Sequence, residues 1–370
     1  MNRWIRVCWP PLWALVAVLT IYAAIHAAFW CLDWIVGFPV FSAQEKEPLA
    51  GIAGFYGFVY ACFRLVAFHP ALRGDYRMWL SGTPWTSQRP LPLGPIHLVP
   101  QDVLLLAIIV AIGWPNLGWR SLTVVQAFLF AYLVGLGFVC SFTGARGWAY
   151  ALGFSMGFMA LFALDPVPFV VAAAVSYALA LLGTRAALAR FPWSAPVPAF
   201  LVRKDLGWPY DRLGPSRAVP SIRLPDALLT GAVAGWLFFA VGYNFGNLPD
   251  AQSGRFVLFL LFCIPAAAFR TMFYCSGYGP PISLAGRIVH GQWIIPGYDR
   301  VFIAPLCAAL VAVAAGLAYA VSGVDSRVTV PIAFTLVWWI LLGMGPSLRE
   351  WRLTGNHRIV PGVPSKEYAR

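Results

Sequence analysis

Charged residues are scarce in this sequence. They make up only 11% of its 370 residues, whereas about a quarter of the residues in soluble domains are charged. Hydrophobic residues reach 60% and the mean hydropathy is +0.73. This composition excludes an ordinary soluble domain and predicts a chain that lies in lipid.

Motifs of common enzymes and metal sites are lacking as well. The seven cysteines contain no C-x-x-C pair, and the five histidines show no H-x-x-x-H or H-x-x-H-H spacing. The aspartates form no D-x-x-D pair, and no serine stands in a G-x-S-x-G motif. We therefore expect no metal and no cofactor, and we expect the cysteines to act as small packing residues.

Ten long apolar segments are present instead. A helix of about 20 apolar residues spans the hydrocarbon of a bilayer, so each segment is a candidate span. The sequence thus predicts an all-α, polytopic membrane helix bundle with about ten transmembrane helices. The segments are 12–35, 49–68, 102–114, 121–142, 148–164, 167–188, 226–245, 255–275, 301–322 and 328–344.

The basic residues predict an orientation for these spans. Ten spans with the amino terminus inside place 22 of the 26 Lys and Arg on the inner side, as the positive-inside rule demands. The four exceptions are Lys46, Arg120, Arg255 and Arg327. We expect both termini in the cytoplasm, and 23 Arg against three Lys, beside much Ala, Gly and Pro, favours a bacterial cytoplasmic membrane.

The net charge of +12 follows from the same bias. Basic residues at the inner surface attract anionic lipids, so membrane lipids are the expected partners. The sequence has no room for a soluble module with a basic surface that could contact DNA or RNA, and we therefore expect no nucleic acid partner.

Three inner connections, residues 69–101, 185–225 and 276–300, hold most of the polar residues. Each is near or below the roughly 40 residues at which a domain folds unaided, so residues 1–370 are predicted to form a single membrane domain. Proline keeps the connections from spanning, whereas their Trp residues favour the headgroup zone. We expect short or irregular helices there, lying in the interface.

Asp102, Asp226 and Asp299 stand at the predicted starts of three spans. A carboxylate in this position accepts unpaired backbone N–H groups, and capping is the role we favour. The alternative is a ring of acids at the mouth of a pathway. Within the spans, His26 is expected to donate a hydrogen bond between helices, and Arg64 to extend its side chain to the inner surface.

A weak catalytic constellation remains on the inner side. It consists of His69, Asp75 and His97 in the first connection and of His290 and Asp299 in the third. A His beside an Asp acts as a general base near neutral pH. The spacing does not require that these residues meet, and the sequence favours a chain that is not an enzyme without deciding the point.

The inner connections also carry residues suited to protein contacts. Trp and Arg are enriched at interaction hot spots, and the candidate docking residues are Trp85, Arg89, Trp208 and Arg212. We expect them to dock a cytoplasmic ATPase or another subunit, with lipid contact as the alternative. Three G-x-x-x-G pairs predict close helix packing, either within the chain or in a homodimer: Gly153 with Gly157, Gly231 with Gly235, and Gly242 with Gly246.

The basic inner loops on a helical bundle, with no ATPase motif in the chain, are similar in general plan to the permease subunits of ATP-driven exporters. In those complexes a separate ATPase docks on inner loops. The resemblance implies a permease-like membrane subunit of a transport or export complex. A membrane-bound lipid-modifying enzyme that uses the inner His and Asp residues, and a non-catalytic membrane scaffold, are the alternatives.

Overall fold

The computed structural model describes residues 12–36, 47–193, 224–244, 251–275, 283–291, 293–295, 297–322 and 325–345. All ten expected spans form helices in this part of the chain. They are α2 (Leu12–Val36), α3 (Glu47–Phe68), α5 (Pro100–Leu117), α6 (Thr123–Phe142), α7 (Arg146–Leu161), α8 (Pro166–Leu188), α9 (Leu224–Asn244), α10 (Ala251–Cys275), α12 (Ile303–Ser322) and α13 (Ser326–Gly343).

Eight helical stretches among the described residues are long and apolar enough to cross a membrane. One of them, the 43 residues Pro100–Phe142, contains both α5 and α6, which are joined by the 3₁₀ turn η1 (Gly118–Leu122). Helix α7 has 16 residues and a length of about 24 Å. It is shorter than the other spans. The prediction of an all-α polytopic bundle is confirmed.

The third span is longer than the sequence predicted. Helix α5 begins at Pro100 and has 18 residues, whereas the apolar segment covered only 102–114. Proline fits the first turn of a helix because the N–H that it lacks has no helical acceptor there. The extension places Asp102 inside the first turn of α5.

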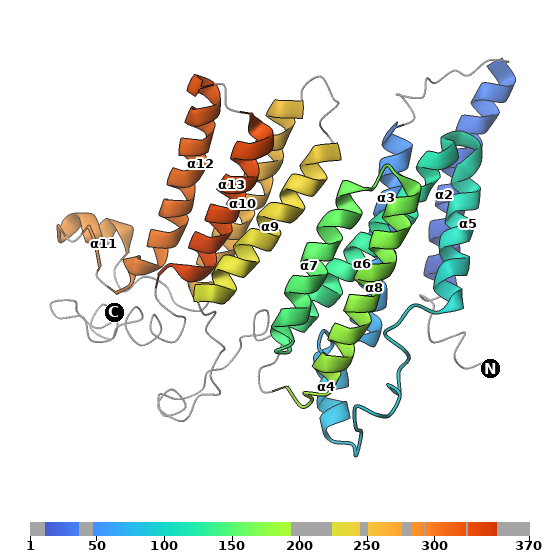
Figure 1. The fold of residues 1–370 in the computed structure, drawn as a ribbon, viewed down its shortest axis with the longest axis horizontal. Helices are drawn as coiled ribbons and strands as arrows, with labels where there is room; N and C mark the ends of the chain where they lie inside the picture. Colours follow the sequence, from blue (N-terminus) through green and yellow to red (C-terminus); the bar gives the residue numbers. More distant parts are fainter. Residues whose placement is uncertain are drawn as a thin grey trace. The chain divides into compact units, whose positions relative to one another are not determined.

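The chain divides into two compact units. The first is Met1–Met156 with Val167–Ala199, and the second is Gly157–Pro166 with Phe200–Arg370. In the first unit, the connection α5–α6 lies at one end, and the short helix α4 (Gly74–Ser81) lies at the other (Figure 1). We call the end with α4 the loop end of this unit and the opposite end its hairpin end.

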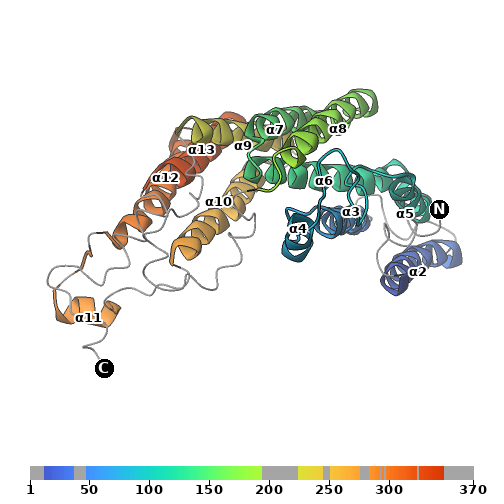
Figure 2. The same ribbon diagram turned by 90° about the horizontal axis from the view of Figure 1, so that it is seen from below.

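Helix α3 packs most extensively against α6 in the first unit (Figure 2). Glycines permit this close approach. A Cβ atom at Gly57 would overlap the carbonyl oxygen of Val124, and one at Gly54 would lie 3.3 Å from Cγ2 of Thr123. Small residues at a crossing let two backbones come together in lipid.

Helix α2 packs on α5 through a polar contact within the spans. His26 is buried, and the Asn116 side-chain amide lies 3.1 Å from its Nδ1. The same amide donates to the His26 carbonyl oxygen at 2.8 Å. The prediction that His26 makes an interhelical hydrogen bond is confirmed, although Asn116 supplies the donor.

In the second unit, α9 packs against α13. A Cβ atom at Gly231 would lie 2.8 Å from the carbonyl oxygen of Thr335, and one at Gly235 would lie 2.9 Å from that of Pro331. This G-x-x-x-G pair therefore packs within the chain. A homodimer through another surface stays a prediction.

The short helix α11 (Leu284–Val289) and the 3₁₀ turn η5 (Asp299–Phe302) precede α12. They lie at the opposite end of the second unit from the start of α13 (Figure 1), and we call this its loop end. Large apolar side chains are exposed on both short helices, Trp79 of α4 at 53% and Val289 of α11 at 79%. The expectation of short helices in the first and third connections is confirmed.

Candidate functional site

Arg64 is a buried cation near the loop end of α3. The residue is 2% exposed, and its Nε lies 2.9 Å from Oδ1 of Asp102 in an ion pair. The expectation that Arg64 extends to the surface is therefore wrong. An ion pair with the first turn of α5 replaces the solvation that an extended side chain would have kept.

Asp102 uses both carboxylate oxygens. Oδ2 accepts the backbone N–H of Val99 at 2.8 Å, and Oδ1 accepts the hydroxyl of Tyr60 at 2.6 Å. Tyr60 stands four residues before Arg64, on the same face of α3. The predicted capping role of Asp102 is confirmed, and the ion pair is an addition to it.

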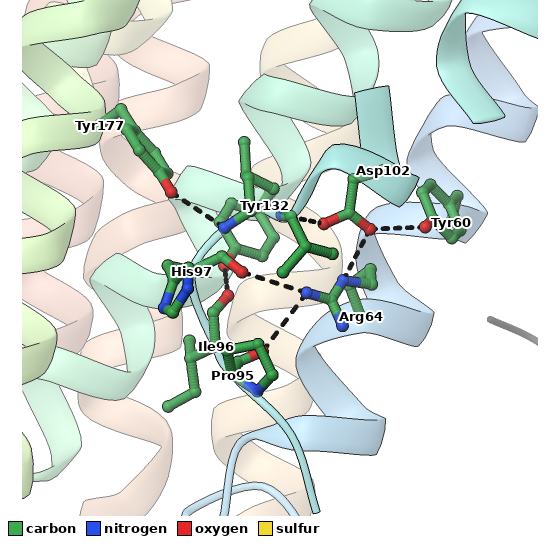
Figure 3. A network of polar contacts seen from close by, with 10 residues as sticks. Tyr60, Arg64, Pro95, Ile96, His97, Asp102, Tyr132 and Tyr177 are labelled. Carbon is green, nitrogen blue, oxygen red and sulfur yellow. Dashed lines mark hydrogen bonds and ion pairs between the residues drawn. The ribbon is translucent and has the colours of Figure 1, made fainter. Parts of the chain in front are cut away.

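The rest of the Arg64 guanidinium holds the chain that leads into α5. Nη2 donates to the carbonyl oxygens of Pro95 at 3.3 Å and His97 at 3.2 Å (Figure 3). The Phe68 ring lies 4.4 Å from the guanidinium carbon and adds a cation–π contact. Nη1 is buried and has no partner among the described residues.

Two tyrosines from other helices complete this arrangement. Tyr132 of α6 donates to the carbonyl oxygen of Ile96, and the Tyr177 hydroxyl of α8 accepts the N–H of Leu98 at 2.9 Å (Figure 3). We call Tyr60, Arg64, Asp102, Tyr132, Tyr177 and the backbone of residues 95–99 the Arg64 network. It ties the end of the first connection to α3, α5, α6 and α8.

The energetics of the Arg64 network indicate that it fixes the position of the chain more than it adds stability. Removing both charges from water costs several kcal/mol per ion, about what their attraction returns, so the pair adds little net stability. Breaking it is costly, because one charge then stays buried without a partner. The network therefore fixes where residues 95–99 lie, and both Asp102 oxygens are already engaged.

His69, a candidate base, follows the last residue of α3. Its ring is buried and stacks on Trp193, with 6.2 Å between ring centroids. Nδ1 accepts the N–H of Ala71 at 3.1 Å, so the neutral ring carries its proton on Nε2. Burial lowers the pKa of His69 to about 3, and the ring is uncharged at neutral pH.

The other candidates of the first connection lie apart from this histidine. Asp75 is exposed in the first turn of α4. The His97 side chain is exposed, and its carbonyl oxygen, not its ring, belongs to the Arg64 network. No hydrogen bond joins His69, Asp75 and His97 to one another in the described part of the chain.

Asp299 belongs to the second unit and repeats part of the Asp102 geometry. Its Oδ2 accepts the N–H of Ile295 at 2.7 Å and lies 2.9 Å from Nη1 of Arg287. The first connection thus ends in a buried ion pair and the third in a half-buried one. His290, directly after α11, is exposed. A catalytic role for these residues stays a prediction.

Two of the four predicted docking residues fall in the described part of the chain. Trp85 is half-buried, donates from Nε1 to the Pro90 carbonyl oxygen at 3.3 Å, and packs edge-on against Phe191. Arg89 is exposed. Trp208 and Arg212 lie outside the described residues.

Sequence reasoning missed the Arg64 network, although it singled out Asp102 as a helix cap. A signal was present, because Tyr60, Arg64 and Phe68 are spaced by four residues along one face of an apolar helix. An ionisable residue within a span generally has a partner nearby. The described residues contain no group of three His, Cys, Asp or Glu placed to hold a metal ion.

The long apolar helices are those of a polytopic integral membrane protein. Comparison with protein-family models, with curated proteins and with solved structures gives no match.

Proposed function

We propose that the chain is the permease-like membrane subunit of a transport or export complex, and that a separate cytoplasmic ATPase docks on its inner connections. The observation that supports this best is the Arg64 network, which links the first connection to four helices. A partner that moves this connection would move α3, α5, α6 and α8 with it. A connection joined only to its two neighbouring helices would transmit such a movement less widely.

The surface of the first connection suits a partner of this kind. Trp79 and Met78 expose apolar area on α4, and the exposed Arg89 side chain can meet a carboxylate of a partner. Exposed aromatic and Arg side chains are the residues that contribute most at protein interfaces. Under this proposal the loop ends of both units face the cytoplasm, where ATP is available.

The test is purification of the chain from its native membrane in a mild detergent, followed by mass spectrometry of the proteins that co-elute. We expect a co-eluting protein with a phosphate-binding loop. When both proteins are reconstituted in vesicles, ATP hydrolysis should fall at least tenfold if this chain carries Trp85→Ala and Arg89→Ala together. Asp75→Ala, an exposed change on the same connection, is the matched control and should leave that hydrolysis unchanged.

Recovery of the chain alone would contradict the proposal, as would an ATPase whose activity ignores the double variant. The same preparations separate the alternatives. If the chain is a lipid-modifying enzyme, a lipid product should form without ATP and should be lost in His97→Gln or His290→Gln. A scaffold would show neither activity.

A further inference from the structure

Arg255 is a buried cation at the end of the second unit where α13 starts, and no described carboxylate forms an ion pair with it. The residue is 3% exposed. Its Nη1 donates to Oγ of Ser326 at 3.0 Å, and its Nε donates to the Gly242 carbonyl oxygen at 3.3 Å. Nη2 is buried and has no partner, and Arg255 forms no ion pair with any described residue. A buried charge in this state is costly, and a bound anion would remove the cost.

A pocket lies against this side chain. The pocket is an open hollow that encloses little space, so a group bound there would lie at its mouth. Aromatic rings form one part of its lining and guanidinium groups another, so it offers both apolar and cationic surface. The lining residues are Phe238, Phe239, Gly242, Tyr243, Arg255, Arg327 and Pro331.

The charges around the pocket favour an anion. Arg255 and Arg327 carry two positive charges. Among the described residues, Asp325 is a nearby carboxylate, and it caps α13 by accepting the N–H of Arg327 at 2.8 Å. Arg255 stands near the amino terminus of α10, and its partner Ser326 is the first residue of α13. Helix amino termini add positive potential, so they increase the attraction for an anion that Arg255 already creates.

The position of the pocket along the membrane spans indicates which anion it could bind. Tyr243 is the last residue of one span, and Arg255 and Arg327 are each the second residue of another. Because a span ends where hydrocarbon gives way to headgroups, we infer that the pocket lies at this boundary, where the phosphates of lipids lie. Phe238 and Phe239 stand about one helical turn deeper along α9, at the level of apolar lipid groups.

We propose that Arg255 and Arg327 bind a phosphate group at this boundary, carried by a phospholipid whose apolar part lies along Phe238 and Phe239. A guanidinium offers several fixed N–H donors that match phosphate oxygens. Inorganic phosphate has the same recognising chemistry, and the experiment distinguishes the two sources. The proposal does not rest on the transport function.

The test uses the full chain in a non-ionic detergent and native mass spectrometry. The protein is titrated with short-chain phosphatidylglycerol, with diacylglycerol of the same chain length, and with inorganic phosphate. We expect one phosphatidylglycerol per chain, bound about tenfold more weakly by Arg255→Gln, because a charge-assisted hydrogen bond is lost. Arg120→Gln removes an exposed Arg from the first unit and is the matched control, with no change expected.

Diacylglycerol should show no dependence on Arg255, since it carries no phosphate. Binding of inorganic phosphate with the same loss in Arg255→Gln, and none of the lipid, would support the phosphate site and overturn the lipid assignment. Equal binding by the unchanged protein and both variants would overturn the proposal. If Arg255→Gln does not fold, Arg327→Gln decides the matter: its side chain is exposed, and binding that is unaffected by its loss would overturn the proposal as well.

Discussion

At the scale of single residues, loss of the Arg64–Asp102 ion pair should lower the stability of the fold most. Asp102→Asn keeps the shape of the side chain but leaves the Arg64 charge buried without a counter-ion. We expect a loss of about 3–5 kcal/mol in the free energy of unfolding. Thermal unfolding in detergent measures it.

Asp75→Asn is the control for this change. The Asp75 carboxylate is exposed, and exposed substitutions usually change stability by less than about 0.5 kcal/mol. Similar unfolding temperatures for Asp102→Asn and the unchanged protein would show that the ion pair does not hold the first connection.

The buried ring of His69 predicts a dependence of stability on pH. Its pKa is about 3 in the folded chain, whereas the pKa of an unperturbed histidine in the unfolded chain is about 6.5. The unfolded state therefore binds a proton first, so His69 lowers stability as the pH falls from 6.5 toward 3. The slope approaches about 1.4 kcal/mol per pH unit for one proton.

Unfolding temperatures recorded between pH 7 and pH 4 check this slope. His69→Gln should flatten the dependence, because the proton-binding group is gone from both states. His97→Gln, which changes an exposed ring, should keep it. Equal slopes for His69→Gln and the unchanged protein would contradict the buried, neutral state of the ring.

At the scale of helices, the close crossing of α3 and α6 makes a separate prediction. In Gly57→Ala the new methyl group would overlap the carbonyl oxygen of Val124 in α6, so the two helices must move apart. Overpacking of this kind costs about 1–3 kcal/mol. Gly51→Ala is the control in the same helix, because nothing lies within 4 Å of the added carbon.

Thermal unfolding of both variants checks the crossing. Gly51→Ala should be neutral or more stable by up to about 1 kcal/mol, since Ala is the better helix former. If Gly57→Ala unfolds at the same temperature as Gly51→Ala, the two backbones do not approach as the structure has them.

The helices themselves followed from the sequence, because the length of an apolar run is set by the thickness of a bilayer. The ends were less certain where polar residues join a span, as Pro100 and Asp102 do in α5. The Arg64 network did not follow, because Tyr60 and Asp102 are 42 residues apart. Their meeting depends on how residues 69–99 return to the helix ends, which local patterns do not encode.

At the scale of the whole molecule, we expect the hairpin end and the loop end of the first unit to face opposite sides of the membrane, with the loop end in the cytoplasm. The bias of 22 basic residues against four predicts this orientation. The docking of an ATPase on the first connection is meaningful only if that connection is cytoplasmic.

Cysteine labelling on a cysteine-free background tests this most directly. Ser87 is exposed in the first connection, and Arg120 is exposed at the hairpin end. We predict that a membrane-impermeant maleimide labels Arg120→Cys in intact cells and labels Ser87→Cys only after the membrane is permeabilised. Efficient labelling of Ser87→Cys in intact cells would contradict the orientation, and with it the proposed function.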